Sequence, residues 1–247
     1  MKPDLNQTVR EIAIEHPTTV RVFESLGIDY CCGGKRTLND ACERAGVSVQ
    51  RALDLLAAVE EEASVDVANW TAAGAAELIG HIVGRHHNYV RSESPRLVIM
   101  LEKVVSRHGQ EHPELASIRD LFGALTQELS AHMLKEENIL FPYFEQMESA
   151  ASRGAAPPPA VFGSVETPIS RMLADHDDAE ELLAEMRGLS SGYRVPASAC
   201  PTYRALYHGL EEFERDLHHH VHLENNILFP RALHLEQRVS EAAHEHH

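Results

Sequence analysis

Residues 132–142 read HMLKEENILFP, and residues 220–230 read HVHLENNILFP. Seven of these eleven positions are identical, including the His, the Glu four residues later and the closing Asn-Ile-Leu-Phe-Pro run. A His and a Glu at positions i and i+4 lie on one face of a helix, about one turn apart. Two such copies can hold a pair of ions with the carboxylates between them. Shells of imidazole and carboxylate in helical bundles are typical of non-haem di-iron sites.

A repeated packing unit is the alternative explanation of the duplication. Packing accounts for the apolar Ile-Leu-Phe run in both copies, but it does not explain why a His and a Glu recur at the same distance from that run. Burying a carboxylate costs several kcal/mol unless a cation or a hydrogen-bond donor compensates. The pattern therefore favours a metal site.

The repeat extends upstream of both motifs. His132 follows His87 by 45 residues, and His220 follows His176 by 44 residues. Each half thus predicts two helices, and the two halves together predict an all-α, up-down-up-down bundle of four antiparallel helices. We expect this bundle at 74–238 with a Pro- and Gly-containing linker at 149–164, after a small helical domain at 1–65 and before a tail at 239–247. Pro142 and Pro230 are expected to end or kink their helices just after the motifs.

One ligand position has two candidates. The apolar face of Ile79, Val83 and Val90 is shared by His86, so the helical period favours His86 as the inward residue. Its neighbour His87 lies about one hundred degrees further around the helix. The periodicity alone selects His86 and leaves His87 as the alternative.

Composition narrows the function classes. Lys and Arg total 22 against 38 Asp and Glu, a net charge of −16, which argues against binding to nucleic acid phosphates. No apolar run approaches the roughly 20 residues of a membrane span, and the start MKPDLNQTVREIA lacks the apolar core of a signal peptide. These features predict a soluble protein.

The N-terminal region contains a pair of adjacent cysteines in GIDYCCGGKRTL, residues 27–38. Adjacent cysteines can close only a strained and easily reduced disulfide ring. The two following glycines indicate an accessible loop, and the charges of Lys35 and Arg36 favour the thiolate. Burial as two small apolar side chains is the alternative. We interpret Cys31 and Cys32 as redox-active catalytic residues.

These motifs together resemble the repair-of-iron-centres family, which are hemerythrin-like di-iron proteins with a short N-terminal CCGG domain. The resemblance covers nearly the whole chain. It implies a bacterial cytoplasmic protein that repairs iron–sulfur clusters damaged by nitrosative or oxidative stress. Carried over onto this sequence, it implies two bridged iron ions held by six ligands, which are His87, His132, Glu136, His176, His220 and Glu224. This choice of His87 disagrees with the apolar register, which selects His86.

The resemblance leaves the mechanism open between iron donation and reduction of NO to nitrous oxide at the di-iron centre. It implies damaged iron–sulfur proteins as partners and NO or O₂ as small ligands, with the electron donor unidentified and a homodimer left open. The alternative is a hemerythrin-like protein that binds or senses O₂ or NO without repair activity. Such a protein would have no use for the CCGG unit, so that unit favours repair.

Overall fold

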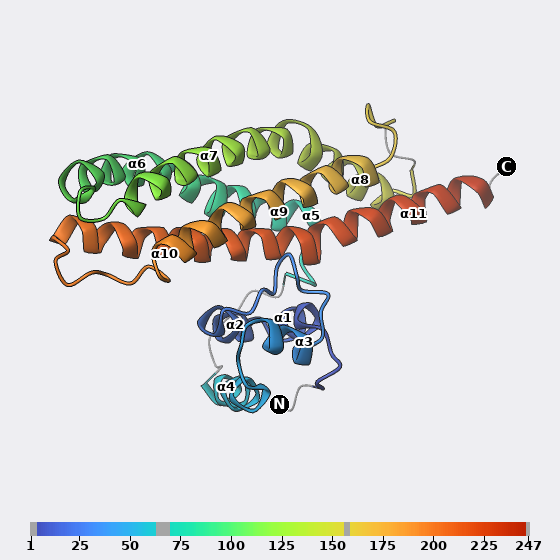
Figure 1. Ribbon diagram of the computed structural model, residues 1–247. Coiled ribbons are helices and arrows are strands. Elements are labelled where there is room, and N and C mark those ends of the chain that lie inside the picture. The colour runs from blue at the N-terminus through green and yellow to red at the C-terminus, as the bar shows by residue number, and fades with distance from the viewer. Residues whose placement is uncertain (1–3, 63–69, 156–158, 246–247) are drawn as a thin grey trace. The chain divides into compact units, whose positions relative to one another are not determined.

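The protein is all-helical over the residues that a computed structural model describes, which are 4–62, 70–155 and 159–245 (Figure 1). This confirms the predicted fold class. The chain divides into two compact units. The first comprises Met1–Gly74 together with His218–Arg231, and the second comprises Ala75–Leu217 together with Ala232–His247. Residues 63–69, which include the expected end of the N-terminal domain at 65, and residues 156–158, in the middle of the expected linker, lie outside the described residues.

The N-terminal part of the first unit consists of short helices with clear start and stop signals. They are α1 (Val9–Glu15), the 3₁₀ turn η1 (Pro17–Thr19), α2 (Val20–Leu26), α3 (Leu38–Arg44) and α4 (Val49–Glu62). Thr8 caps α1 in a reciprocal capping box with Glu11, and the Thr37 side chain accepts from the Asp40 amide at the start of α3. Gly27 ends α2 in the left-handed conformation at φ 64°.

A small apolar core holds these helices around the CCGG loop. Ile12, Phe23 and Leu38 are fully buried, and Tyr30 packs against Phe23 with ring centroids 6.2 Å apart. Gly34 is required by close contact with backbone rather than by a positive φ, whereas a Cβ on Gly33 would meet the Arg36 and Asp29 side chains. A Cβ on Gly34 would lie 2.5 Å from the Tyr30 carbonyl oxygen. The glycines therefore let the loop fold tightly, whereas the sequence predicted that they keep it open.

Four continuous helical rods follow. They are α5 (Ala75–His81), η2 (Ile82–His87) and α6 (Asn88–His108); α7 (Glu114–Lys135), η3 (Glu136–Leu140) and α8 (Phe141–Ser152); α9 (Glu166–Leu189); and α10 (Pro201–Leu223), η4 (Glu224–Leu228) and α11 (Phe229–Glu245). Figure 1 shows the long helices running lengthwise beside one another, and α7 packs against both α6 and α9. The fourth rod contributes its middle, His218–Arg231, to the first unit.

The turns η2, η3 and η4 are π-helical, so each inserts one wide turn into an otherwise regular rod. Pro142 and Pro230 do not end their helices, although an end was one of the two expected outcomes, and a kink at either proline stays a prediction. Regular α-helix resumes at Phe141 and Phe229, which places each proline in a first turn, where the missing N–H is tolerated. Two expected boundaries also move: α8 extends to Ser152, inside the expected linker, and α11 continues to Glu245 through most of the expected tail.

The internal repeat is visible in how the halves begin. The Glu148 carboxylate accepts from the Ala75 amide at the start of α5, at 2.8 and 2.9 Å. Glu236, at the matching place in the second half, accepts from the Val165 amide before α9 at 2.9 Å. A carboxylate at a helix N-terminus satisfies free N–H groups and complements the helix dipole. A glutamate near the end of each half therefore caps the first helix of the same half.

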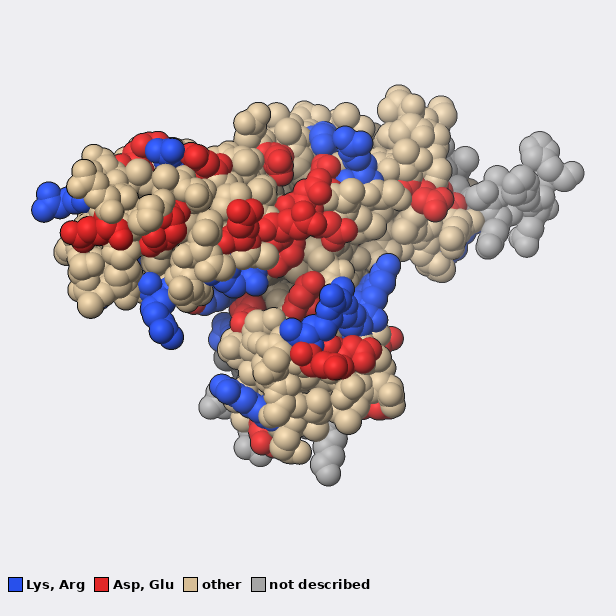
Figure 2. Space-filling model, viewed as in Figure 1, with Lys and Arg blue, Asp and Glu red and all other residues tan. Residues whose placement is uncertain are grey.

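The surface is acidic, as the net charge requires. On the face shown in Figure 2, Asp and Glu side chains gather in clusters over the long helices, with smaller groups of Lys and Arg between them. Among the described residues, no helix combines the length and the apolar character that a membrane crossing needs.

We predict that Gly34→Ala destabilises the first unit by about 1–3 kcal/mol, because the new Cβ meets backbone rather than a movable side chain. Urea unfolding of the full chain measures this change. Asn39→Ala, at an exposed position of α3, is the matched control and should leave the unfolding midpoint near that of the native protein. An unchanged midpoint in Gly34→Ala would show that the loop has room for a side chain.

Candidate metal centre

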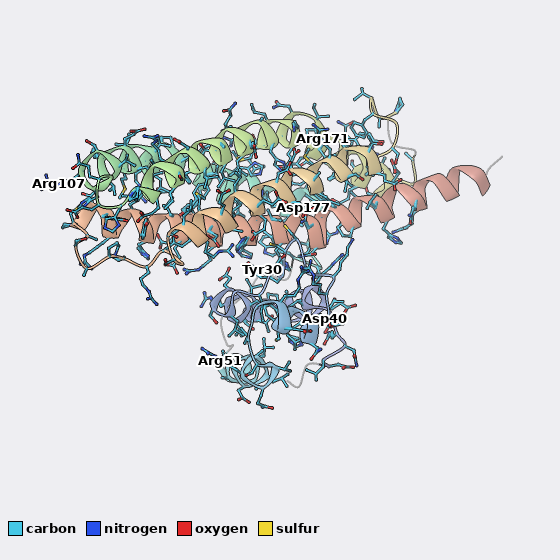
Figure 3. All side chains as sticks on the ribbon, in the orientation of Figure 1. Tyr30, Asp40, Arg51, Arg107, Arg171 and Asp177 are labelled. Atoms are coloured by element: carbon cyan, nitrogen blue, oxygen red, sulfur yellow. The ribbon has the colours of Figure 1, made fainter. Side chains whose placement is uncertain are left out.

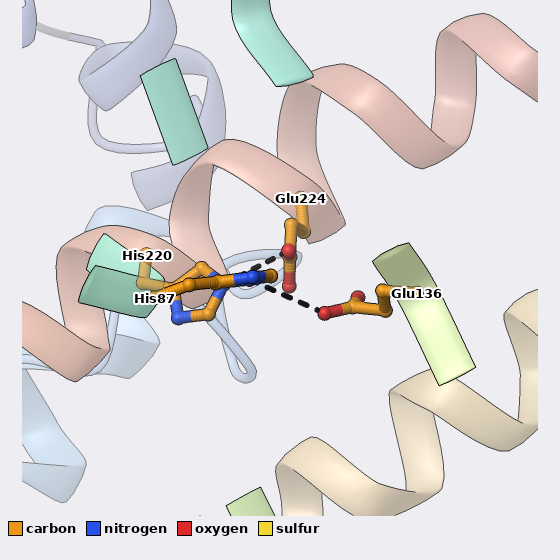
Figure 4. Close-up of side chains that lie close together, drawn as sticks. All are labelled: His87, Glu136, His220 and Glu224. Atoms are coloured by element: carbon orange, nitrogen blue, oxygen red, sulfur yellow. Dashed lines mark hydrogen bonds and ion pairs between the residues drawn. The ribbon is translucent and has the colours of Figure 1, made fainter. Parts of the chain in front are cut away.

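Six buried side chains from the four rods converge inside the bundle. Two four-residue groups could each hold an ion, with all ligand atoms of a group within 4.8 Å of one another. The first group is His87, Glu136, His220 and Glu224, drawn in Figure 4. The second group is His132, Glu136, His176 and Glu224. Both glutamates belong to both groups, which is the arrangement that two bridging carboxylates require.

The π-helical turns determine which of these side chains point into the bundle. Glu136 and Glu224 are the first residues of η3 and η4, and His87 is the last residue of η2. A π turn adds one residue, so consecutive side chains can both point inward where a regular helix would turn one away. His86 and His87 are accordingly both buried, at 1% and 0% exposure. The α-helical period that selected His86 does not hold across this turn.

The structure separates the two adjacent histidines by their partners. His87 joins the first ligand group. The Nδ1 atom of His86 instead lies 3.1 Å from an Asp216 carboxylate oxygen, and the His86 ring meets His81 edge-on with centroids 5.4 Å apart. Arg85 also approaches Asp216, at 3.6 Å. His86 therefore belongs to a polar cluster beside the ligand groups, and the geometry favours His87 as the ligand.

An outer carboxylate orients the ring of His87. Its Nδ1 donates to Glu137 at 2.5 Å, and Arg91 holds the same Glu137 oxygen at 2.6 Å. Burial raises the pKa of Glu137, but the hydrogen bonds from His87 and Arg91 outweigh it and bring the pKa below its ordinary value. The ionised carboxylate thus places a proton on Nδ1, and in the neutral ring the lone pair of Nε2 points inward.

His132 is oriented in the same way by Asp175. The His132 Nδ1 atom lies 3.3 Å from Asp175, which also accepts from Lys135 at 2.9 Å. On the inner side, His132 Nε2 lies 3.1 Å from His176 Nε2 and 3.2 Å from a Glu136 oxygen. Each ligand group therefore contains one histidine whose outer nitrogen is fixed by a carboxylate and a neighbouring cation.

The inner geometry fits a bound cation. Glu136 and Glu224 are both 0% exposed. Glu136 oxygens lie 3.4 Å from His87 Nε2 and 3.2 Å from His132 Nε2, and Glu224 lies 2.9 Å from His220 Nε2. Lone pairs of neutral rings facing buried carboxylates repel each other unless a positive charge lies between them. Imidazole and carboxylate donors in this number suit iron.

The CCGG loop lies in the first unit and is arranged around Asp29. One Asp29 oxygen accepts from the amides of Cys31 and Cys32 at 3.1 and 3.0 Å, and the other accepts from the Gly33 amide at 2.7 Å. The Sγ atoms of the two cysteines lie 3.9 Å apart, and the Cys31 Sγ atom also lies 3.5 Å from an Asp29 oxygen. The expectation of an open loop is wrong for Cys31, which is 4% exposed, because the Asp29 carboxylate draws the backbone inward. Cys32 is partly exposed.

Several residues at these sites were not found from the sequence. Glu137 follows the motif glutamate directly, and Asp175 precedes His176, but their roles depend on which side chain each ligand ring faces. Asp29 had no pattern to distinguish it. His222 had a usable signal, because it occupies the repeat position of Leu134. It is 3% exposed, and burial, its largest influence, lowers its pKa to about 3.

The fold and this cluster define a helical-bundle protein with a buried cation-binding site. Residues 78–232 match the model of the hemerythrin HHE cation binding domain. Residues 5–60 match a second family model, ScdA_N, which is described as a domain of unknown function. The two matches fall on the two regions that the sequence predicted as bundle and N-terminal domain.

Curated relatives match both regions at once. The iron-sulfur cluster repair protein YtfE of Pectobacterium carotovorum is 37% identical over 230 residues, which cover 92% of this chain and 97% of the relative. The protein of the same name from Edwardsiella ictaluri is 40% identical over 228 residues, covering 90% and 95%. The chain belongs to this YtfE family of hemerythrin-like proteins, which confirms the predicted resemblance.

We predict that His87→Ala lowers the iron content and changes the visible spectrum, whereas His86→Ala does so much less. The reason is that His87 lies in a ligand group while His86 bonds Asp216. Metal analysis and absorption spectra of both variants test this ranking. The opposite ranking would show that the α-helical register identified the ligand and that the geometry misassigns it.

We also predict that Glu137→Gln weakens iron binding by about 10- to 100-fold, the usual effect of removing a group that orients a ligand. Competition with a chelator gives the affinity, and the visible spectrum reports the changed donor strength of His87. Glu145→Gln, at an exposed position of α8, is the control for the loss of one negative charge. Equal affinities for the native protein and Glu137→Gln would mean that the carboxylate does not act through His87.

Proposed function

We propose that this chain repairs iron–sulfur clusters through a di-iron centre held by His87, His132, Glu136, His176, His220 and Glu224. The observation that carries the proposal is that both buried glutamates belong to both ligand groups. The YtfE relatives, similar over nearly their full length, are iron-sulfur cluster repair proteins. Damaged iron–sulfur proteins are the proposed clients, and the cytoplasm, where thiols stay reduced, is the proposed compartment.

When bound, the two irons would supply redox chemistry and binding positions for NO or O₂. The protein's own contribution is to hold both ions with neutral rings and two carboxylates in a buried site. Glu137 and Asp175 fix the rings from outside, and their charges are offset by Arg91 and Lys135. Neutral imidazoles release a metal more readily than thiolates do, so this donor set is compatible with iron donation as well as with NO removal.

The adjacent cysteines are the proposed source of electrons. Oxidation of Cys31 and Cys32 to a disulfide releases two electrons and two protons. Conversion of two NO molecules to one N₂O and one water consumes two electrons and two protons, so the two half-reactions balance. A thiol reductant then restores the dithiol by exchange. The partly exposed Cys32 is the sulfur that such a reductant would reach.

We predict that replacing both Cys31 and Cys32 by Ser leaves the iron content unchanged, because neither belongs to a ligand group, but abolishes multiple-turnover NO consumption with a thiol reductant. Anaerobic NO consumption and metal analysis of the purified full chain test this. Cys42→Ser, at a buried cysteine of α3, is the control for general thiol loss.

Two results would contradict this assignment. Unchanged turnover in the double Ser variant would make the loop structural. Loss of iron together with activity would place the cysteines in the metal site. Repair of a nitrosylated iron–sulfur protein by the double Ser variant at the native rate would separate iron donation from NO reduction.

A further inference from the structure

The π turn η4 carries two side chains with different targets. Its first residue, Glu224, faces His220 in the ligand group. Two residues later, Asn226 is buried and donates from Nδ2 to the Tyr30 carbonyl oxygen at 3.1 Å. Tyr30, labelled in Figure 3, directly precedes Cys31. All these residues belong to the first unit.

Two further residues, His222 and Arg10, support the contact between Asn226 and Tyr30. The second hydrogen of its Nδ2 amino group can go to His222 Nδ1, 2.9 Å away, and the His222 ring packs on Tyr30 with centroids 5.3 Å apart. Arg10 of α1 donates from its guanidinium to the Asn226 backbone carbonyl at 3.1 Å. A buried amide with its donors satisfied fixes the backbone it bonds.

Hydrogen bonds within the CCGG loop link the position of the Tyr30 carbonyl to the positions of the cysteine sulfur atoms. Asp29 ties three successive loop amides, those of residues 31–33, to one carboxylate. The Gly34 carbonyl accepts from the Arg10 amide at 2.8 Å. The loop is therefore held at both ends, and the position of the Tyr30 carbonyl determines where the dithiol lies.

We propose that Asn226 is a positioning residue that holds the Cys31–Cys32 dithiol against the turn carrying the metal ligand Glu224, so that the dithiol serves the centre of its own chain. This inference rests on the proposed redox role of the cysteines. One hydrogen bond and a short stretch of backbone then connect Cys31 with Glu224. The dithiol becomes a disulfide and releases two electrons and two protons; two ferric ions, when bound, would take up the two electrons and become ferrous.

The internal repeat provides a matched comparison. Asn138 occupies the same motif position in η3, but its Nδ2 donates to the Leu134 carbonyl of its own helix at 2.7 Å. Leu134, which replaces His222 at the equivalent position, is 57% exposed. The same residue in the same motif thus has a local role in one half and a long-range role in the other. Asn138→Ala is accordingly the control for Asn226→Ala.

The test uses the full-length, iron-loaded chain under anaerobic conditions. The first readout is the rate at which iodoacetamide modifies Cys31 and Cys32, which mass spectrometry follows on the tryptic peptide of residues 22–35. The second is the rate at which the oxidised centre is reduced by the protein's own dithiol without added reductant, followed by absorbance. Iron content and helicity are measured in parallel.

We expect Asn226→Ala to keep its iron and its spectrum. Its cysteines should react roughly three- to tenfold faster with iodoacetamide, because the loop opens. Reduction of its metal centre by the dithiol should be at least about tenfold slower. Asn138→Ala should match the native protein in both rates. Arg10→Met keeps the aliphatic stem of the side chain but removes the donor to Asn226. Like Asn226→Ala, it should raise the alkylation rate and lower the reduction rate, and it decides the question if Asn226→Ala does not fold.

Several results would overturn the inference. The inference is wrong if Asn226→Ala is alkylated at the native rate or loses its iron. It is also wrong if Asn138→Ala has the same effect as Asn226→Ala. A native protein that shows no internal reduction at all would instead contradict the redox role of the cysteines. The alkylation ratio would still decide whether Asn226 holds the loop, so the two failures are distinguishable.

Discussion

The burial of two carboxylates, Glu136 and Glu224, is the constraint on which the rest of the structure depends. Each is completely buried, and an uncompensated carboxylate in such a place would cost several kcal/mol. Four imidazoles surround them, and the outer carboxylates Glu137 and Asp175 turn two of these rings so that their Nε2 atoms face inward. The charges outside the site are balanced locally by Arg91 and Lys135. A metal ion held by both ligand groups would supply the positive charge needed inside.

The same constraint explains the three π turns. A regular helix presents one inward position per turn, whereas the site needs Glu and His side chains at closely spaced positions along the rods. Three of the four rods gain an extra residue beside the ligands, and only α9, which supplies His176 alone, remains regular over its length. A π turn is less stable than α-helix and is found mostly at functional sites. Its presence beside both glutamates agrees with a site that the metal helps to stabilise.

The sequence predicted much of the site but not its geometry. The repeated motif predicted His132, Glu136, His220 and Glu224 as ligands, because their spacing and duplication needed an explanation beyond packing, and the structure brings these side chains together. Periodicity selected His86, whereas the structure brings His87 into a ligand group, because a π turn leaves no mark in the apolar pattern. Cys31 was expected in an open loop, but its burial depends on Asp29, whose role appears only when three amides converge on it. Pro142 and Pro230 were expected to end or kink their helices, and neither ends one, because a proline just after a π turn lies in a first turn.

The divergence between the two motifs now has a physical interpretation. Identical positions of the repeat serve the metal and the bundle core, which both halves need. The positions that differ serve tasks that only one half has. Glu137 orients His87, and its counterpart is Asn225. His222 and Leu223 are buried in the first unit, whereas their counterparts Leu134 and Lys135 are largely exposed. The second motif has thus become a surface that holds the CCGG loop, while Asn226, unchanged in identity, acquired a new partner through its surroundings.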